Sequence, residues 1–90
     1  MELSQTIAVL SALAQPTRYR CVEMLVEKGA SSAGDLAVGL GVPANTMSSH
    51  LTILTHAGLV SSTKDGRHVV YRANVESVAN LIGTLKQLAV

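Results

Sequence analysis

The chain has 90 residues, of which 48% are hydrophobic and 14% are charged, and its formal net charge is +1. This length allows one small domain, and high hydrophobicity with low charge excludes intrinsic disorder. The chain has no uninterrupted apolar run of about 18 residues, so no membrane span is predicted. The first residues lack the basic segment of a secretory signal. The single cysteine excludes an internal disulfide and favours the cytosol. We therefore expect one domain over residues 1–90 in the cytoplasm, with no membrane partner.

The apolar residues are almost all aliphatic, because Tyr19 and Tyr71 are the only aromatic side chains. A domain of this size buries only about 60–65% of its unfolded surface, so some aliphatic surface is left outside the core of a monomer. Exposed apolar patches of that kind mark association surfaces. The composition therefore predicts self-association.

Two helices are predicted in the first third of the chain. The first spans residues 4–14 and the second spans residues 17–28, because Pro16 cannot continue the first helix but suits the first turn of the second. Gly29 ends the second helix. The apolar stripes at helical spacing are Ile7, Leu10, Leu13 and Ala14 in the first helix and Tyr19, Val22, Leu25 and Val26 in the second.

A helix-turn-helix is predicted next. Ser32 is a candidate N-cap, with Asp35 three residues on, and the short helix that follows ends at Gly41. The turn at residues 41–43 leads into a helix over residues 44–56. The apolar stripes are Leu36, Ala37 and Leu40 in the short helix and Met47, Leu51 and Leu54, with Ile53 beside them, in the longer one.

The opposite face of the helix at residues 44–56 carries short polar side chains. They are Asn45, Thr46, Ser48, Ser49 and Thr52, with His50 nearby. A helix of this length fits the major groove of B-DNA, and short side chains let its backbone approach the base edges. A solvated face is the alternative interpretation, but solvated faces usually carry Lys and Glu, and this face has neither.

Two β-rich runs follow, at residues 59–63 and 67–72, joined through Lys64-Asp65-Gly66, in which the Asp-Gly dipeptide is typical of hairpin turns. Asn74 is then expected to cap a last helix. Its apolar stripe is Val75, Val78, Leu81 or Ile82, Leu85 and Leu88. The predicted order α-α-α-α-β-β-α is that of a winged helix-turn-helix, mainly α with a β-hairpin wing at residues 59–72.

Basic side chains that could contact DNA phosphates lie outside the polar helix. The candidates are Arg18, Arg20, Lys64 and Arg67, with His68 and Arg72 as further possibilities. Because the helix itself has no Arg or Lys, it cannot read guanine by the common bidentate contact. For each basic residue, an ordinary surface charge is the alternative.

Several spaced motifs resemble those of the arsenic-repressor-like (ArsR/SmtB-type) winged-helix regulators. They are Ala14-Gln15-Pro16-Thr17-Arg18-Tyr19-Arg20, Leu36-Ala37 through Gly41-Val42, Ser48-Ser49-His50-Leu51-Thr52-Ile53-Leu54, Ala57-Gly58-Leu59-Val60, Asp65-Gly66-Arg67 and Val70-Tyr71-Arg72. The resemblance covers about residues 5–85. It implies a homodimeric, cytoplasmic transcriptional repressor that releases operator DNA when an inducer binds. Where a serine usually caps the recognition helix of this family, this chain has Pro43.

The first and last helices are the expected dimer interface. Its predicted residues are Ile7, Leu10, Val78, Ile82, Leu85 and Leu88. Packing of the stripe on its own core is the alternative. Gly83 within the last helix costs about 1 kcal/mol relative to alanine, which close approach of a second helix could offset. Twofold symmetry then predicts a palindromic site in double-stranded DNA.

The metal ligands of the family are not matched. The thiolate pair of its metal sensors would fall at Ser32 and Gly34, and the last helix offers only Glu76 and Lys86 as ionisable groups. Cys21 is expected to be a small buried hydrophobic residue. We therefore predict no metal site and no cofactor. A small organic inducer, a protein partner and no inducer all stay open.

Two other classes of function were compared with a repressor. The first is a winged-helix protein-association module without operator binding, which would use the same polar face for a partner. The second is an enzyme, and neither a phosphate loop nor a Cys–His pair with an orienting group supports it. The sequence thus favours a DNA-binding repressor that is not an enzyme.

Overall fold

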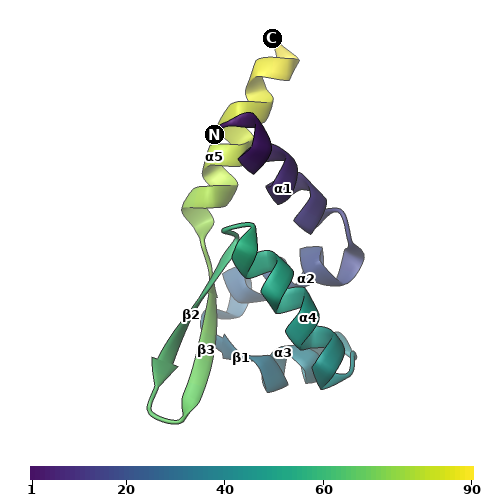
Figure 1. The fold of residues 1–90 in the computed structure, drawn as a ribbon, viewed down its shortest axis with the longest axis vertical. Coiled ribbons are helices and arrows are strands. Elements are labelled where there is room, and N and C mark those ends of the chain that lie inside the picture. The colour runs from purple at the N-terminus through teal and green to yellow at the C-terminus, as the bar shows by residue number, and fades with distance from the viewer.

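The computed structural model describes all 90 residues and has the predicted order of elements. They are α1 (Leu3–Leu13), α2 (Pro16–Lys28), β1 (Ser31–Ser32), α3 (Ala33–Leu40), α4 (Ala44–His56), β2 (Val60–Asp65), β3 (His68–Ala73), α5 (Val75–Lys86) and a 3-10 turn (Gln87–Ala89). The molecule measures 45 × 24 × 22 Å, with α1 and α5 at one end of the long axis and the tip of the β2–β3 hairpin at the other (Figure 1). The winged helix-turn-helix prediction is confirmed. None of the helices is both long and apolar enough to cross a bilayer.

The hydrophobic core is built from one stripe of each helix and the start of β2. Met47, Leu51 and Leu54 of α4 are almost completely buried, as predicted. The other core residues are Val9, Ala12, Cys21, Val22, Leu25, Leu36, Ala37, Ala57, Leu59, Val60 and Leu81. Because α4 contributes three of the largest buried side chains, its rotation about its own axis is set by the core.

Three helix ends follow the predicted local chemistry. The Oγ of Ser32 accepts a hydrogen bond from the backbone N–H of Asp35 at 3.1 Å, which caps α3. Gly41 ends α3 with φ +68°, a conformation in which a β-carbon is disfavoured. Pro43 precedes α4 and gives it no side-chain cap, and no neighbouring side chain replaces that hydrogen bond. The start of α4 therefore leaves backbone N–H groups free.

The buried face of α1 differs from the predicted stripe. Thr6, Val9 and Ala12 face the core, whereas Ile7 is 56% exposed. The reason is that the Thr6 Oγ1 donates to the backbone oxygen of Glu2 at 2.9 Å, so a polar side chain is buried with its hydrogen bond satisfied. A prediction of the buried face of α1 from hydrophobicity alone could not include Thr6.

The stripe predicted for α2 is also partly wrong. Val22 and Leu25 are buried together with Cys21, but Tyr19 and Val26 are more than half exposed. Ile53 of α4 is likewise 43% exposed instead of packed beside the core. Tyr19 and Val26 each lie about one-third of a turn around α2 from the face that enters the core, so their apolar side chains border the core without entering it.

The sheet has three strands in the order β1-β3-β2, and β1 was not predicted. Ser31 pairs with Tyr71 and Ser32 with Val70. Two serines are too short a segment to show alternation, so only the neighbouring β3 makes them a strand. In the hairpin, Asp65 pairs with His68, which places the turn one residue later than predicted.

Asn74 precedes α5 but does not cap it as predicted. Its Nδ2 donates to the backbone oxygen of Gly58 at 2.9 Å, and its Oδ1 accepts from the Oγ of Ser61 at 3.1 Å. The Oγ of Ser77 donates to the same Gly58 oxygen at 2.8 Å. The start of α5 is therefore hydrogen-bonded to the corner between α4 and β2, because the Gly58 carbonyl at that corner has no other partner.

Gly83 and Gly58 should respond in opposite directions to the same substitution. A β-carbon at Gly83 meets nothing within 4 Å, so Gly83→Ala should raise the free energy of unfolding by about 1 kcal/mol through helix propensity. Gly58 also has open space but has φ +79°, so Gly58→Ala should lower it by about 1 kcal/mol. Urea denaturation followed by circular dichroism at one protein concentration measures both. A loss of stability in Gly83→Ala would contradict the open environment of this residue.

Candidate nucleic-acid interface

The polar face of α4 points to solvent because the opposite face is held in the core. Asn45, Thr46, Ser48, Ser49 and Thr52 are all exposed, and His50 is half-buried at the edge of the face. The six side chains predicted to read DNA thus lie together on one helix, between the α3–α4 turn and the hairpin. Their short length allows the helix backbone to come close to a partner surface.

Two hydroxyl groups on this face have their protons engaged within α4. The Oγ of Ser49 donates to the backbone oxygen of Asn45 at 3.3 Å, and the Oγ1 of Thr52 donates to that of Ser48 at 3.0 Å. Their oxygen lone pairs stay available as acceptors. In this state the two side chains suit a donor on the partner, such as the exocyclic amino group of adenine or cytosine.

Arg18 connects α1, α2 and α4. Its Nε donates to the backbone oxygen of Ala12 at 2.7 Å, its Nη2 donates to that of Ser11 at 3.4 Å, and its Nη1 lies 3.4 Å from the Nδ1 of His50. A guanidinium has only donors, so this contact is a hydrogen bond in the tautomer of His50 whose Nδ1 carries no proton. Arg18 therefore contacts His50 of α4 and also donates to the last carbonyl groups of α1. The sequence did not indicate either role.

The other predicted basic residues lie apart from Arg18. Lys64 is near the tip of the hairpin, opposite Val69, and Arg67 is in its turn beside Gly66, which has φ +65°. Arg20 is on α2, and all three side chains are exposed. The cations are thus distributed around α4 on α2 and on the wing, not on α4 itself.

A polar hollow of about 260 Å³ lies between the second half of α4 and the sheet. It is lined by Leu51, Thr52, Thr55, His56, Ser62 and Tyr71. Of these only Thr52 was a predicted site residue. Ser62 and Tyr71 are partners in the hairpin register. Counting back from the predicted Asp65-Gly66 turn would have paired Ser62 with Val69 instead, so the predicted turn does not identify this pair. Their position beside α4 depends on how the wing packs.

The residues predicted for a dimer interface divide into two groups. Ile7, Ile82 and Leu88 are exposed by 56%, 56% and 84%. Leu10, Val78 and Leu85 are partly buried and pack against the core. Between the two alternatives for α5, Leu81 enters the core and Ile82 does not. An apolar surface on α1, α5 and the 3-10 turn after α5 is therefore left without a partner within the chain, at the end of the molecule opposite the wing (Figure 1).

Three comparisons identify the family. Residues 13–63 match a family model described as a helix-turn-helix domain. The chain is 33% identical over 84 residues to the HTH-type transcriptional regulator YgaV of Escherichia coli (strain K12), covering 93% of this chain and 85% of that protein. The structure of an ArsR-like transcriptional regulator from Rhodococcus sp. RHA1 aligns with a TM-score of 0.87 and 31% identity, over 96% of this chain and 80% of that one. The chain belongs to the ArsR family of winged helix-turn-helix transcriptional regulators.

A further ArsR-like relative has a known assembly. It is a homodimeric winged helix-turn-helix DNA-binding domain from Mycobacterium bovis, described as a possible ArsR-family regulator. It aligns with a TM-score of 0.79 and 29% identity over 96% of this chain and 79% of that one. In this fold α4 is the second helix of the helix-turn-helix and the β2–β3 hairpin is the wing.

In this ArsR-family chain the single cysteine lies inside the core. Cys21 has no exposed surface, and burial raises the pKa of its thiol to about 11. A protonated, buried thiol is a poor nucleophile and a poor metal ligand at neutral pH. No three His, Cys, Asp or Glu side chains in the chain gather closely enough to hold a metal ion. The expectation of a buried, apolar role for Cys21 is confirmed.

The raised pKa of Cys21 should make stability fall with pH above 9. The unfolded thiol ionises near its ordinary value of 9.0 whereas the folded thiol ionises near 11, so the unfolded state releases its proton first and gains stability as the pH rises between these values. From pH 8 to pH 10 the native chain should lose about 1 kcal/mol more than Cys21→Ala. Urea denaturation of both proteins at both pH values measures this difference. Equal losses would show that Cys21 keeps its ordinary pKa in the fold.

Proposed function

We propose that this regulator is a dimeric repressor that binds palindromic double-stranded operator DNA in the cytoplasm. The observation that carries the proposal is the exposed polar face of α4, which has no Lys or Glu and lies between Arg18 and the wing. In each protomer α4 enters a major groove, where Asn45, Ser49 and His50 contact base edges. Thr46, Ser48 and Thr52 complete the contact surface.

The wing and α2 supply the attraction to phosphates in this proposal. Lys64 and Arg67 contact the backbone beside the groove that α4 occupies, while Arg18 and Arg20 contact it from the start of α2. The polar hollow between α4 and the sheet offers hydroxyl groups of Ser62 and Tyr71 to the same strand. Since α4 has no cation, the phosphate contacts set affinity and the polar face of α4 sets sequence preference.

The dimer forms through the apolar surface of α1 and α5. Ile7, Ile82 and Leu88 supply the side chains that have no cover within the chain, and Leu10, Val78 and Leu85 continue the surface toward the core. A homodimeric relative with the same fold supports this arrangement. A twofold axis at this end directs two copies of α4 toward half-sites about 34–36 Å apart on one face of the DNA.

Removing the polar contacts of α4 should reduce operator affinity. For Ser49→Ala combined with His50→Ala we expect at least about a hundredfold weaker binding to a labelled duplex of the promoter upstream of its own gene, because two base contacts are lost from each protomer and each costs about 1–3 kcal/mol. Fluorescence anisotropy from about 50 to 200 mM salt measures the affinity. With about three or four phosphate contacts per protomer, the log–log salt slope of the native dimer should be about −5 to −7.

Two further variants distinguish sequence-specific contacts with bases from sequence-independent attraction to phosphates. Ser4→Ala removes an exposed hydroxyl from α1 and should leave binding unchanged. Arg67→Ala should weaken binding to the promoter and to an unrelated duplex alike, and should reduce the salt slope by about 2, one phosphate contact from each protomer. Weak binding that neither α4 nor the wing affects would favour the alternative, a winged helix that associates with proteins.

Dimerisation should depend on Leu88. A glutamate there would be buried without a partner in two symmetric copies, so Leu88→Glu should weaken the dimer by at least about tenfold. Val38→Glu is the matched control, because Val38 on α3 is also 84% exposed but lies away from α1 and α5. Sedimentation velocity over a concentration series measures both. A dimer that Leu88→Glu leaves intact would place the interface elsewhere.

A further inference from the structure

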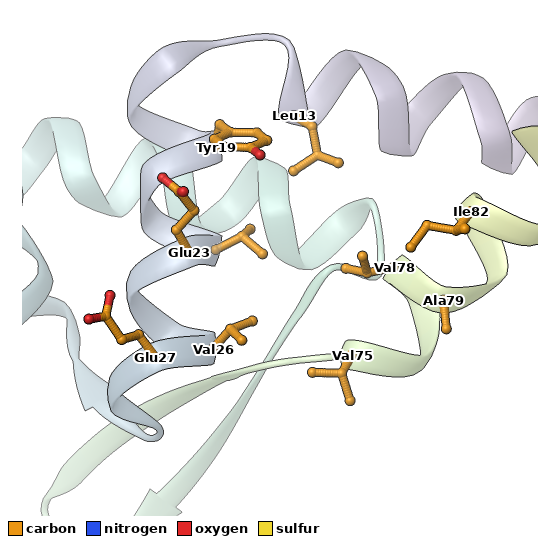
Figure 2. A pocket seen from close by; sticks show the side chains of 10 residues that line it. Leu13, Tyr19, Glu23, Val26, Glu27, Val75, Val78, Ala79 and Ile82 are labelled. Carbon is orange, nitrogen blue, oxygen red and sulfur yellow. The ribbon is translucent and has the colours of Figure 1, made fainter.

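An open groove of about 510 Å³ lies between α2 and α5, closed at one end by Leu13 of α1 (Figure 2). Eight of its ten lining residues are hydrophobic. Val26 of α2 and Val75 and Ile82 of α5 are each more than half exposed, so the groove is not filled from within the chain. A concave apolar site of this size accommodates a drug-sized molecule.

The charged part of the lining is entirely acidic. Glu23 and Glu27 are the two remaining lining residues that carry charge, and the lining contains no Lys, Arg or His. They lie four residues apart on α2, so both are on one side of that helix, and Figure 2 shows them beyond Val26, on the flank of α2 that is farther from α5. The lining thus carries a formal charge of −2 in a chain whose net charge is +1.

Tyr19 continues this row at the end of the groove. It precedes Glu23 by four residues, its ring lies next to Leu13, and its side chain is 53% exposed. The face of a tyrosine ring attracts cations, and carboxylates beside it strengthen the attraction. An apolar wall, an aromatic ring and two carboxylates together match a molecule with an apolar body and a positive charge.

The same end of the groove adjoins the contact that reaches the recognition helix. Leu13 and Tyr19 line the groove, and Arg18, which precedes Tyr19, contacts the Ala12 carbonyl and the Nδ1 of His50. A molecule bound against Tyr19 and Leu13 would therefore contact the chain neighbours of Arg18 and Ala12. Through them it would act on the contact between Arg18 and His50 at the DNA-reading face of α4.

We propose that the groove between α2 and α5 is the inducer site, and that its ligand is a hydrophobic organic cation. This inference rests on the proposed repressor function for its effect on DNA, but not for ligand binding itself. Val78 and Ile82 border both the groove and the proposed dimer interface, so the site lies at the edge of the dimer. The carboxylates of Glu23 and Glu27 lie on α2, outside the proposed dimer interface on α1 and α5, and stay exposed to solvent.

The test uses two probes of nearly equal size and opposite charge. Isothermal titration calorimetry of the full chain, without DNA, should detect tetraphenylphosphonium binding at least about tenfold more tightly than tetraphenylborate. Glu23→Gln combined with Glu27→Gln should abolish this preference while keeping the shape of the groove. Glu76→Gln, which removes a carboxylate from α5 outside the groove, is the matched control and should leave the preference unchanged.

The outcomes are distinguishable from those of the DNA experiment. Equal affinity for both probes, a preference that survives in the double variant, or no binding because a second copy fills the groove would each overturn the inference, even if operator binding holds. If the cation binds as expected, adding it to the protein–promoter complex should weaken DNA binding by at least about tenfold, and Arg18→Lys should reduce that response. Cation binding without any effect on a DNA complex would overturn the inducer role.

Discussion

The burial of Met47, Leu51 and Leu54 is the constraint on which the rest of the structure depends. These three side chains lie on one side of α4 and have almost no exposed surface, so α4 cannot rotate without opening the core. Closely packed interiors tolerate little displacement. The face with Asn45 and Ser49 is presented outward as a direct consequence.

Two polar contacts then position the elements around α4. Arg18 joins the end of α1 to the start of α2 and to His50, and Asn74 joins the start of α5 to the carbonyl of Gly58. The first sets α2 beside the recognition helix, and the second sets the direction in which α5 leaves the sheet. Arg18 makes these contacts in addition to the phosphate contact proposed for it, whereas Asn74 makes its contact in place of the predicted helix cap.

The same packing separates two surfaces. The polar face of α4 and the wing lie toward one part of the molecule, and the apolar surface of α1 and α5 lies at the other end (Figure 1). A protomer arranged in this way can pair through one end and bind DNA with the other. The groove between α2 and α5 lies between these surfaces, so a ligand there contacts elements that belong to both.

Much of this architecture follows from the sequence alone. The bounds of α4, the caps at Ser32 and Gly41 and the buried stripe of α4 rest on local chemistry and short-range periodicity, and the structure confirms them. It also confirms the hairpin, with the turn one residue later than predicted. The motifs from Ala14 to Arg72 also indicate the ArsR family. What only the tertiary structure decided is which side chains beside a stripe enter the core, as with Thr6 instead of Ile7, and that Ser31 and Ser32 form a strand. It also decided that Arg18 contacts His50 and that Tyr71 lies beside α4, because these contacts join residues far apart in the chain, whose approach depends on the packing of whole elements.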